Sequence, residues 1–212
     1  MNELVEKFNY KSILITGGTG FLGRNITPLL ESADIDVLSV GRKYNLTKWD
    51  KAKKLFKLKK YDLIIHAAAF QGAGDFTIRY PADQYFKNNL IHTNVLECWK
   101  RYQSQARLVG IGSTCSYPGG LPVLSEEDYF TGPLHPSVET YGLTKCLMNQ
   151  GIKAYKKQYG LSGTVVVFAT LYGPHDEFNI SRSHVVSALI QKFCDAKRDG
   201  LPQVEVWGDG SQ

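Results

Sequence analysis

Apolar and polar positions along this chain follow two alternating periods. Short, continuously apolar runs rich in β-branched residues are typical of buried parallel strands, and they occur at 11–18, 35–42, 61–69, 107–116, 164–173 and 204–208. Between them lie longer segments in which apolar residues recur with helical spacing, at 21–32, 48–60, 81–103, 138–160 and 183–197. Strands that alternate with helices predict a parallel sheet covered on both faces, so we expect a doubly wound α/β domain.

The composition is that of a chain able to bury a core. Its 212 residues are 43% hydrophobic and 21% charged, which suits one large domain, or one domain and a piece of another. No apolar run reaches the roughly 18–20 residues of a membrane span, and the first ten residues lack the apolar stretch of a secretory signal. The four cysteines are scattered, which argues against a disulfide framework or a zinc site. We therefore expect a cytoplasmic protein with no metal ion and no membrane partner.

The positive charge is concentrated in one segment. Residues 48–60 hold seven lysines and one aspartate, whereas the formal net charge of the whole chain is only +5. The segment reads as a solvated amphipathic helix with Trp49, Ala52, Leu55 and Phe56 facing inward. A nucleic-acid patch is the alternative, but no second basic cluster extends the footprint, so we expect no nucleic-acid partner.

A glycine-rich turn follows the first predicted strand and precedes a helix. The run 17–23 satisfies both G-x-G-x-x-G and G-x-x-G-x-x-G. Glycine allows the tight turn, the close approach of a pyrophosphate and the close packing of helix on strand, and the helix N-terminus offers free N–H groups. This strand–turn–helix context predicts dinucleotide binding, with a purely structural turn as the alternative.

The end of the second strand favours NADP or NADPH over NAD. An acidic residue there would suit the adenosine ribose of NAD, but Arg42 and Lys43 follow Gly41 instead. Cations suit a 2′-phosphate. Two surface cations without a role in binding are the alternative.

Tyr141 and Lys145 form a Y-x-x-x-K pair on a predicted helix. The i, i+4 spacing puts both side chains on one helix face, where an ammonium group would favour the phenolate of Tyr141. A tyrosine whose pKa is lowered in this way can act as an acid or base near neutral pH. The preceding strand ends in Gly112-Ser113-Thr114-Cys115, so its hydroxyl groups lie at the mouth of the expected cofactor crevice.

Five segments together resemble the extended short-chain dehydrogenases/reductases, the NAD-dependent epimerase/dehydratase family. They occur in that family's order and are TGGTGFLG at 16–23, HAAA at 66–69, GSTCSYP at 112–118, YGLTK at 141–145 and LYGPHDEF at 171–178. Within the family they are most similar to the GDP-L-fucose synthases, through the Ser-x-Cys of 113–115, the Tyr-Pro of 117–118 and Ser-His-Val at 183–185. The resemblance implies a Rossmann fold and an NADP-dependent epimerase/reductase of a 4-keto sugar nucleotide.

The same resemblance implies roles for individual residues. Ser113 and Tyr141 would bind the C4 oxygen of the substrate, and Lys145 would hold the nicotinamide ribose. Cys115 and His184 would move protons at C3 and C5, with an inert core cysteine and an inert helix-end histidine as alternatives. Asn88 or Asn89 would help to line the site. The expected substrate contacts are Ser113, Thr114, Tyr141, Asn179 and Lys192. The expected cofactor contacts are Gly17, Gly18, Thr19, Gly20, Phe21, Leu22, Gly23, Arg42, Lys43, Ala67, Ala68, Ala69 and Lys145.

Other functions stay open beside this one. A dehydratase of the family usually carries Asp-Glu where this chain has Thr114-Cys115, which argues against dehydration. An NAD-dependent 4-epimerase or a simple 4-ketoreductase would need only Ser113, Tyr141 and Lys145. A non-catalytic NADP-binding module is the third possibility. His66, on an apolar strand, is expected to be packed and hydrogen-bonded, and His135 and His175 are assigned no role.

Family members are longer than this chain. We expect residues 1–174 to form the cofactor domain with the catalytic Ser, Tyr and Lys, and 175–212 to begin a substrate domain that is truncated here. A fragment, a truncated gene product and a partner that supplies the rest are the alternatives. The resemblance also implies a homodimer through the helices at 81–103 and 138–160, with Leu147, Gly151 and Ala154 on the outward face.

Overall fold

A five-stranded parallel sheet forms the centre of the molecule. The computed structural model describes residues 9–72, 76–179 and 182–206. In these residues the sheet has the order β2-β1-β3-β4-β5, and every adjacent pair is parallel. The strands are β1 (Ser12–Thr16), β2 (Asp36–Val40), β3 (Leu63–His66), β4 (Arg107–Ile111) and β5 (Gly163–Val166). The predicted doubly wound α/β fold is confirmed, because helices cover the sheet from both sides.

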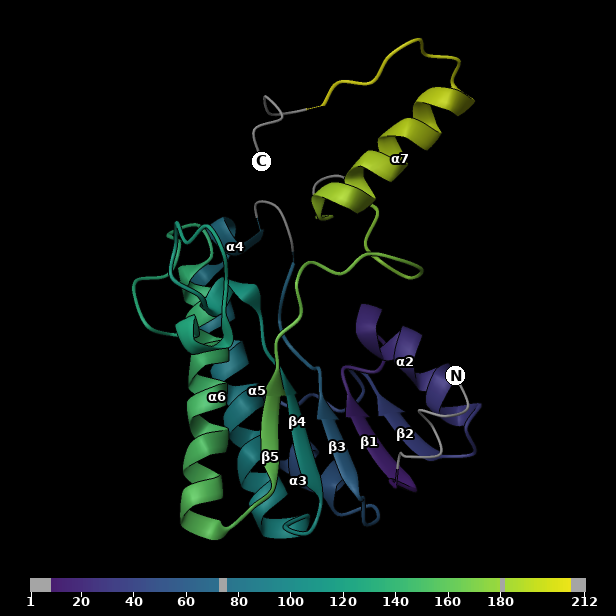
Figure 1. The fold of residues 1–212 in the computed structure, drawn as a ribbon. Coiled ribbons are helices and arrows are strands. Elements are labelled where there is room, and N and C mark those ends of the chain that lie inside the picture. The colour runs from purple at the N-terminus through teal and green to yellow at the C-terminus, as the bar shows by residue number, and fades with distance from the viewer. Residues whose placement is uncertain (1–8, 73–75, 180–181, 207–212) are drawn as a thin grey trace.

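The helices divide unequally between the two faces (Figure 1). Three of them, α3 (Trp49–Phe56), α5 (Pro81–Tyr102) and α6 (Glu139–Tyr159), pack on one face. The other face is covered by α2 (Phe21–Glu31), which contacts β1 and β2. A short helix, α4 (Phe76–Arg79), was not predicted, and α7 (Val185–Arg198) comes last.

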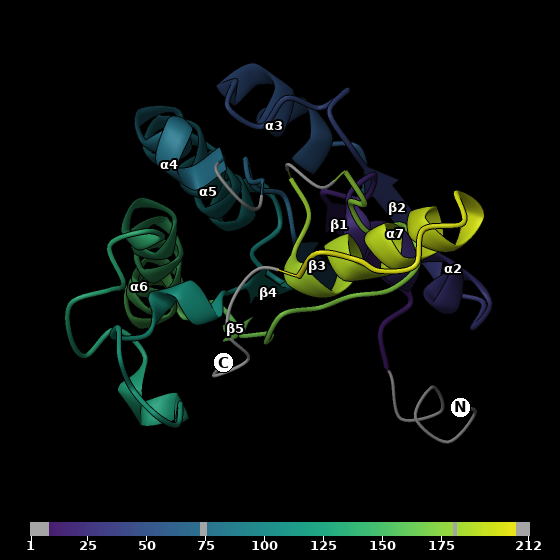
Figure 2. The ribbon, with the colours of Figure 1, turned by 90° about the horizontal axis from the view of Figure 1, so that it is seen from above.

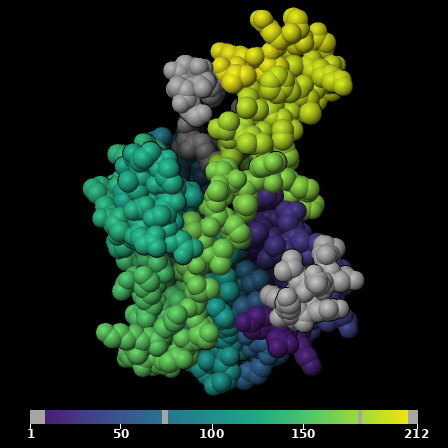
Figure 3. Space-filling view, viewed as in Figure 1, coloured from purple at the N-terminus to yellow at the C-terminus, as the bar shows by residue number. Residues whose placement is uncertain are grey.

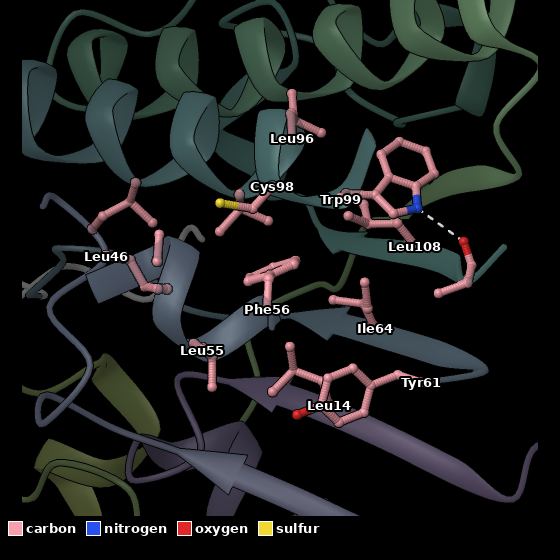
Figure 4. Close-up of a cluster of buried hydrophobic side chains, with 14 of the residues drawn as sticks. Leu14, Leu46, Leu55, Phe56, Tyr61, Ile64, Leu96, Cys98, Trp99 and Leu108 are labelled. Carbon is pink, nitrogen blue, oxygen red and sulfur yellow. Dashed lines mark hydrogen bonds between the residues drawn. The ribbon is translucent and has the colours of Figure 1, made fainter. Parts of the chain in front are cut away.

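The larger core lies between the sheet and α3, α5 and α6 (Figure 4). Trp99 is fully buried there, and its indole N–H donates to the carbonyl of Ala106 at 2.8 Å. The lysine-rich segment forms α3, whose Leu55 and Phe56 are fully buried, so the prediction of an amphipathic helix is confirmed. A buried aliphatic or aromatic side chain contributes about 1.5–3 kcal/mol, so this cluster holds the helices against the sheet.

Two expectations about local structure were wrong. No strand forms at 204–206, because no described strand lies beside that segment, and 207–208 lie outside the described residues. Gly151 does not face outward: a Cβ there would lie 2.6 Å from Cδ1 of Leu96 on α5. Leu147 and Ala154 are exposed, as expected. Within the described residues, no helix is both long and apolar enough to span a membrane.

The carboxyl edge of the sheet is where the connecting segments gather. All five strands end at this edge, and α7 lies above it when the molecule is seen from the side or from above (Figures 1 and 2). In the space-filling view, α7 and residues 199–206 stand out from the body (Figure 3). Ligands of open α/β sheets bind at this edge, so the fold directs attention to the space beneath α7.

Candidate active site

The glycine-rich turn joins β1 to α2 at the carboxyl edge. Gly17 has φ +76°, and a Cβ on it would lie 2.7 Å from the backbone N of Ala68. Gly20 precedes the first residue of α2, and no side chain caps the N–H groups of that helix. The helix therefore presents free donors and the positive end of its dipole, which is the environment that phosphate oxygens prefer.

Two other glycines of the turn serve packing. A Cβ on Gly23 would lie 2.4 Å from the Cα of Gly18, and Gly18 N donates to the carbonyl of Val40 at 2.7 Å. The turn is thus pressed against the end of β2, where Gly41 approaches Thr19 so closely that a Cβ would lie 2.3 Å from its Oγ1. Arg42 and Lys43 follow in an exposed turn. In this motif Gly17 and Gly20 line the cavity, whereas Gly18 and Gly23 allow β1, α2 and β2 to pack closely.

Helix α6 carries Tyr141 and Lys145 into the interior. Both are almost fully buried, and the Lys145 ammonium donates to the carbonyl of Ile111, the last residue of β4, at 2.8 Å. The ammonium nitrogen lies 5.6 Å from the centre of the Tyr141 ring. The Tyr141 hydroxyl donates to Oε1 of Gln71 at 2.9 Å. The predicted pair therefore shares one helix face, with the hydroxyl of one and the ammonium of the other bound to different partners.

Burial dominates the ionisation of both residues. Desolvation lowers the pKa of Lys145 to about 8, with Cys115 opposing it. Desolvation, helped by Cys115 and Tyr129, raises the pKa of Tyr141 above its ordinary value. The expected lowering of the tyrosine pKa was wrong for this arrangement, because the cost of burying a phenolate outweighs an ammonium group that lies over the ring and binds Ile111.

A single turn of 3-10 helix (Thr114–Ser116) follows β4 and adjoins α6. The Ser113 hydroxyl accepts from Cys115 N at 3.2 Å, and the Ser116 hydroxyl donates to the carbonyl of Gly142 at 3.1 Å. A Cβ on Gly142 would lie 2.1 Å from the Cys115 carbonyl oxygen. The glycine after Tyr141 therefore lets the helix approach the turn, which brings the tyrosine beside Ser113 and Cys115.

One cavity of about 590 Å³ collects most of the predicted site residues. All five predicted catalytic residues line it, namely Ser113, Cys115, Tyr141, Lys145 and His184. Of the predicted cofactor and substrate contacts, it is also lined by Gly17, Gly20, Phe21, Leu22, Ala67, Ala69 and Thr114. Side chains that lie up to 167 residues apart in the sequence thus face one space, as their positions at the carboxyl edge predict.

The other predicted contacts do not line this cavity. They are Gly18, Thr19, Gly23, Arg42, Lys43, Ala68, Asn179 and Lys192. The carbonyl of Asn179 accepts from the N–H groups of Arg182 and Ser183 in the approach to α7, and the Lys192 ammonium donates to the carbonyl of Glu205. Neither Asn179 nor Lys192 is thus among the residues that line the cavity, and Arg42 and Lys43 lie in an exposed turn outside it.

Asn88 is hydrogen-bonded to the backbone of Phe70 and does not line the cavity. It is fully buried, and its side-chain amide accepts from Phe70 N at 2.7 Å and donates to Phe70 O at 3.1 Å. Neither Asn88 nor Asn89 lines the cavity, so the expectation that one of them does was wrong. Asn88 instead fixes the backbone next to Gln71, the residue that binds the Tyr141 hydroxyl.

Several lining residues had no place in the sequence prediction. Gln71 comes two residues after the HAAA segment, and Arg24 directly after the last glycine of the turn, so both adjoin recognised motifs. His175, Asp176, Glu177 and Arg182 come from the approach to α7. The first three belong to the LYGPHDEF segment that the sequence singled out, whereas Arg182 lies outside it. That these residues face the cavity depends on contacts with distant residues, which the sequence does not show.

His66 is buried and hydrogen-bonded, as expected. Its Nδ1 lies 2.8 Å from the Thr16 hydroxyl and its Nε2 lies 2.9 Å from Nδ1 of His92. Burial, with Lys145 adding to it, lowers the pKa of His66 to about 3, and burial also lowers that of His92 well below its ordinary value. Two neutral imidazoles therefore join β1, β3 and α5 beneath the cavity.

Comparison with known proteins agrees with this geometry. Residues 13–212 match the profile of the NAD dependent epimerase/dehydratase family. The chain belongs to this family. A GDP-L-fucose synthase of Sinorhizobium fredii (strain NBRC 101917 / NGR234) is 35% identical over 203 residues, which are 95% of this chain and 64% of that protein. The chain therefore spans less than two thirds of that relative's length.

Two solved structures of epimerase/dehydratase-like proteins share the fold. A GDP-L-fucose synthetase from Naegleria fowleri bound to NADP has a TM-score of 0.83 and 27% identity, covering 94% of this chain and 66% of that one. A GDP-6-OMe-4-keto-L-xylo-heptose reductase from C. jejuni has a TM-score of 0.80 and 26% identity, covering 88% and 54%. The Rossmann fold of this epimerase/dehydratase family member is thus confirmed.

Proposed function

We propose that this chain carries the cofactor site and the proton-transfer residues of an NADP-dependent epimerase/reductase of a 4-keto sugar nucleotide. The observation that carries the proposal is that the tyrosine–lysine pair, Ser113, Cys115 and His184 line the same cavity as the phosphate turn. Similarity to GDP-L-fucose synthases supports the GDP-sugar class. The expected reaction is epimerisation at C3 and C5 followed by reduction at C4.

The glycine turn fits a dinucleotide pyrophosphate. The N-terminus of α2 has uncapped N–H groups, and Gly17 and Gly20 line the cavity beside it. NADPH supplies a hydride when bound there. Lys145 would hold its nicotinamide ribose, because the ammonium is fixed at the carboxyl end of β4 by Ile111.

Arg42 and Lys43 remain our candidates for binding the 2′-phosphate. They follow Gly41, which is in close contact with Thr19 of the phosphate turn, so the exposed cations lie next to the cofactor end of α2. The double variant Arg42→Ala/Lys43→Ala should raise the Kd of NADPH by roughly 10-fold or more and leave that of NADH nearly unchanged. Equal changes for both cofactors in calorimetric titrations would exclude a 2′-phosphate role.

Epimerisation requires a proton to leave one face of a carbon and another to return on the opposite face. A 4-keto group acidifies the neighbouring C–H bonds, and their loss places negative charge on the C4 oxygen. Ser113 and Tyr141 would donate hydrogen bonds to that oxygen, and each such donor contributes about 2.7–4 kcal/mol in studied enzymes. Cys115 and His184, which line the same cavity, would take and return the protons.

Reduction would use the same carbonyl. Tyr141 would give its hydroxyl proton to the C4 oxygen as that carbonyl is reduced. Burial keeps the phenol protonated, which is the form that this proton donation needs. The hydroxyl must first leave Gln71, because a phenol has one proton to donate.

Label exchange in deuterated water tests this mechanism. With NADPH and GDP-4-keto-6-deoxymannose, we expect deuterium at C3 and C5 of the product, detected by NMR. Cys115→Ser should slow label uptake more than reduction, whereas Cys194→Ser, on the exposed side of α7, is the matched control and should change neither. Equal loss of both activities in Cys115→Ser would contradict its role as a proton carrier.

A simple 4-ketoreductase is the second candidate. The likeness to the C. jejuni heptose reductase favours it, and it would need Ser113, Tyr141 and Lys145 alone. It predicts reduction without deuterium at C3 or C5. In both cases Tyr141→Phe should lower the rate by about 100-fold or more while NADPH still binds.

We also propose that the boundary of the cofactor domain lies near residue 174 and that α5 and α6 form a homodimer interface. Phe86 on α5 is 61% exposed and Leu147 on α6 is 51% exposed, so both helices offer apolar surface to solvent. Leu147→Lys should shift the sedimentation profile from dimer to monomer. A wild-type chain that sediments as a monomer at all concentrations would remove this part of the proposal.

The four unpaired cysteines favour a reducing compartment such as the cytoplasm. Cys115 would need to stay a thiol to carry protons, which is consistent with that environment. Fractionation of cells that express the chain would test the location, and recovery with secreted proteins would contradict it.

A further inference from the structure

The segment between β5 and α7 crosses above α2 on its way to His184. It appears in both views as the yellow-green connection that runs toward α2 and turns back into α7 (Figures 1 and 2). His175, Asp176 and Glu177 of this segment line the cavity. Two hydrogen-bonded contacts hold it, one at Pro174 and one at Asp176.

The first contact ties the segment to the phosphate-binding helix. The side-chain amide of Asn25 donates to the carbonyl of Phe21 at 2.9 Å and to the carbonyl of Pro174 at 2.8 Å. Phe21 is the first residue of α2 and lines the cavity, whereas Pro174 is 149 residues away from Asn25 in the sequence. The amide of one α2 residue thus binds both the carbonyl of Phe21 in its own helix and the carbonyl of Pro174 in the segment.

The second contact ties the segment to α7. The Asp176 carboxylate accepts from the Ser187 hydroxyl and from Glu177 N. Ser187 lies in the first turn of α7 and is only 1% exposed. Hydrogen bonds to a carboxylate are stronger than those between neutral groups, and a negative charge at a helix N-terminus is favourable. Asp176 therefore holds the beginning of α7.

His184 depends on these contacts because it is the residue that precedes α7. Its imidazole is exposed, and it makes no side-chain hydrogen bond with any residue in 9–72, 76–179 or 182–206. The backbone alone therefore sets where the ring stands over the cavity. That backbone is fixed by Ser187, three residues further on, and through Asp176 and Pro174 by α2.

We infer that Asn25 and Asp176 are positioning residues for His184, which they hold at a set place relative to the phosphate turn. The inference rests on the proton-transfer role proposed above for His184. Displacement of a reacting group by about 1 Å can cost roughly 100-fold in rate, so a contact far from the chemistry can matter for it.

Imidazole NMR tests the positioning without any turnover. The chain has five histidines, and His184→Gln identifies the His184 resonance. We expect Asn25→Leu, which keeps the approximate shape but removes both N–H donors, and Asp176→Ala to shift that resonance. Asp176→Asn should restore it, because an amide oxygen still accepts from Ser187. The His135 resonance is the internal reference.

Asn149→Leu on α6 is the matched control for Asn25→Leu and should leave the His184 resonance in place. If neither Asn25→Leu nor Asp176→Ala moves that resonance, the inference is overturned. A shift in Asp176→Asn as large as in Asp176→Ala would also overturn it, because the hydrogen bond would then not be what positions the ring.

The deuterium experiment supplies the second measurement. Asn25→Leu should slow label uptake at the carbon that His184 serves by about 10- to 100-fold while the Kd of NADPH stays within about twofold. Parallel losses of label uptake and NADPH affinity would indicate a general role in stability and contradict positioning. If the wild-type chain takes up no label, the proposed function fails, and the resonance of His184 still decides whether Asn25 and Asp176 hold it.

Discussion

Replacement of Gly142 by alanine should separate α6 from the turn that carries Cys115. A Cβ at this position would lie 2.1 Å from the carbonyl oxygen and 2.8 Å from the carbonyl carbon of Cys115. These are backbone atoms, and the Ser116 hydroxyl already binds the carbonyl of Gly142 at 3.1 Å. The overlap can be relieved only if the helix or the turn moves, which would also move Tyr141.

The magnitude follows from two opposing effects. Alanine gains about 1 kcal/mol over glycine inside a helix. Overpacking costs typically about 1–3 kcal/mol and occasionally more, and a backbone overlap of this size belongs at the upper end. We therefore expect Gly142→Ala to lower the free energy of unfolding by about 2 kcal/mol.

Gly151→Ala on the same helix is the matched control. Its Cβ would meet only Cδ1 of Leu96, at 2.6 Å, and the end of a side chain can rotate away. Gly151→Ala should therefore stay within about 1 kcal/mol of the wild type. Urea denaturation followed by circular dichroism measures both variants. If Gly142→Ala is as stable as Gly151→Ala, the close contact between α6 and the turn is refuted.

Two further predictions concern pH. Burial holds the pKa of Lys145 at about 8, below its ordinary 10.5, so the unfolded chain binds more protons between these values. Its contribution to the free energy of unfolding should rise by about 3 kcal/mol over that range, and Lys145→Met should abolish the rise in pH-dependent denaturation. Burial also lowers the pKa of His66 from 6.5 to about 3, so its contribution is lost as pH falls through that interval. His66→Phe should therefore reduce the loss of unfolding free energy that occurs as the pH falls through this interval. The variant His135→Gln, at an exposed position, is the control. If His66→Phe loses as much stability in acid as the wild type, other groups cause the loss.

The sequence was sufficient for features that depend on local pattern. Continuous apolar runs marked the five strands, and the inward face of α3 followed from the spacing of Leu55 and Phe56. The position of Ser113 at a strand end, before the helix with Tyr141 and Lys145, also predicted that these residues would lie at the cofactor crevice, and they line one cavity with the phosphate turn. These predictions succeed because periodicity and strand polarity are properties of neighbouring residues.

Features that depend on distant partners could not be predicted. Asn25 finds Pro174 across 149 residues, and the Tyr141 hydroxyl finds Gln71 across 70. The tyrosine pKa was misjudged for the same reason, since its burial follows from packing rather than from the Lys145 beside it in the motif. The short apolar run at 204–208 predicted a strand, but its described part, 204–206, has no adjacent strand with which to pair.

Calorimetric titration of the chain with NADPH and NADH tests the central claim most directly. We expect saturable binding of one NADPH per chain, because the cavity combines the glycine turn with Lys145. The affinity for NADH should be lower, because Arg42 and Lys43 would bind the 2′-phosphate that only NADPH carries. The titration requires only the folded chain, which circular dichroism can verify in the same sample. A correctly folded chain that gives no saturable heat with either nucleotide would contradict the account.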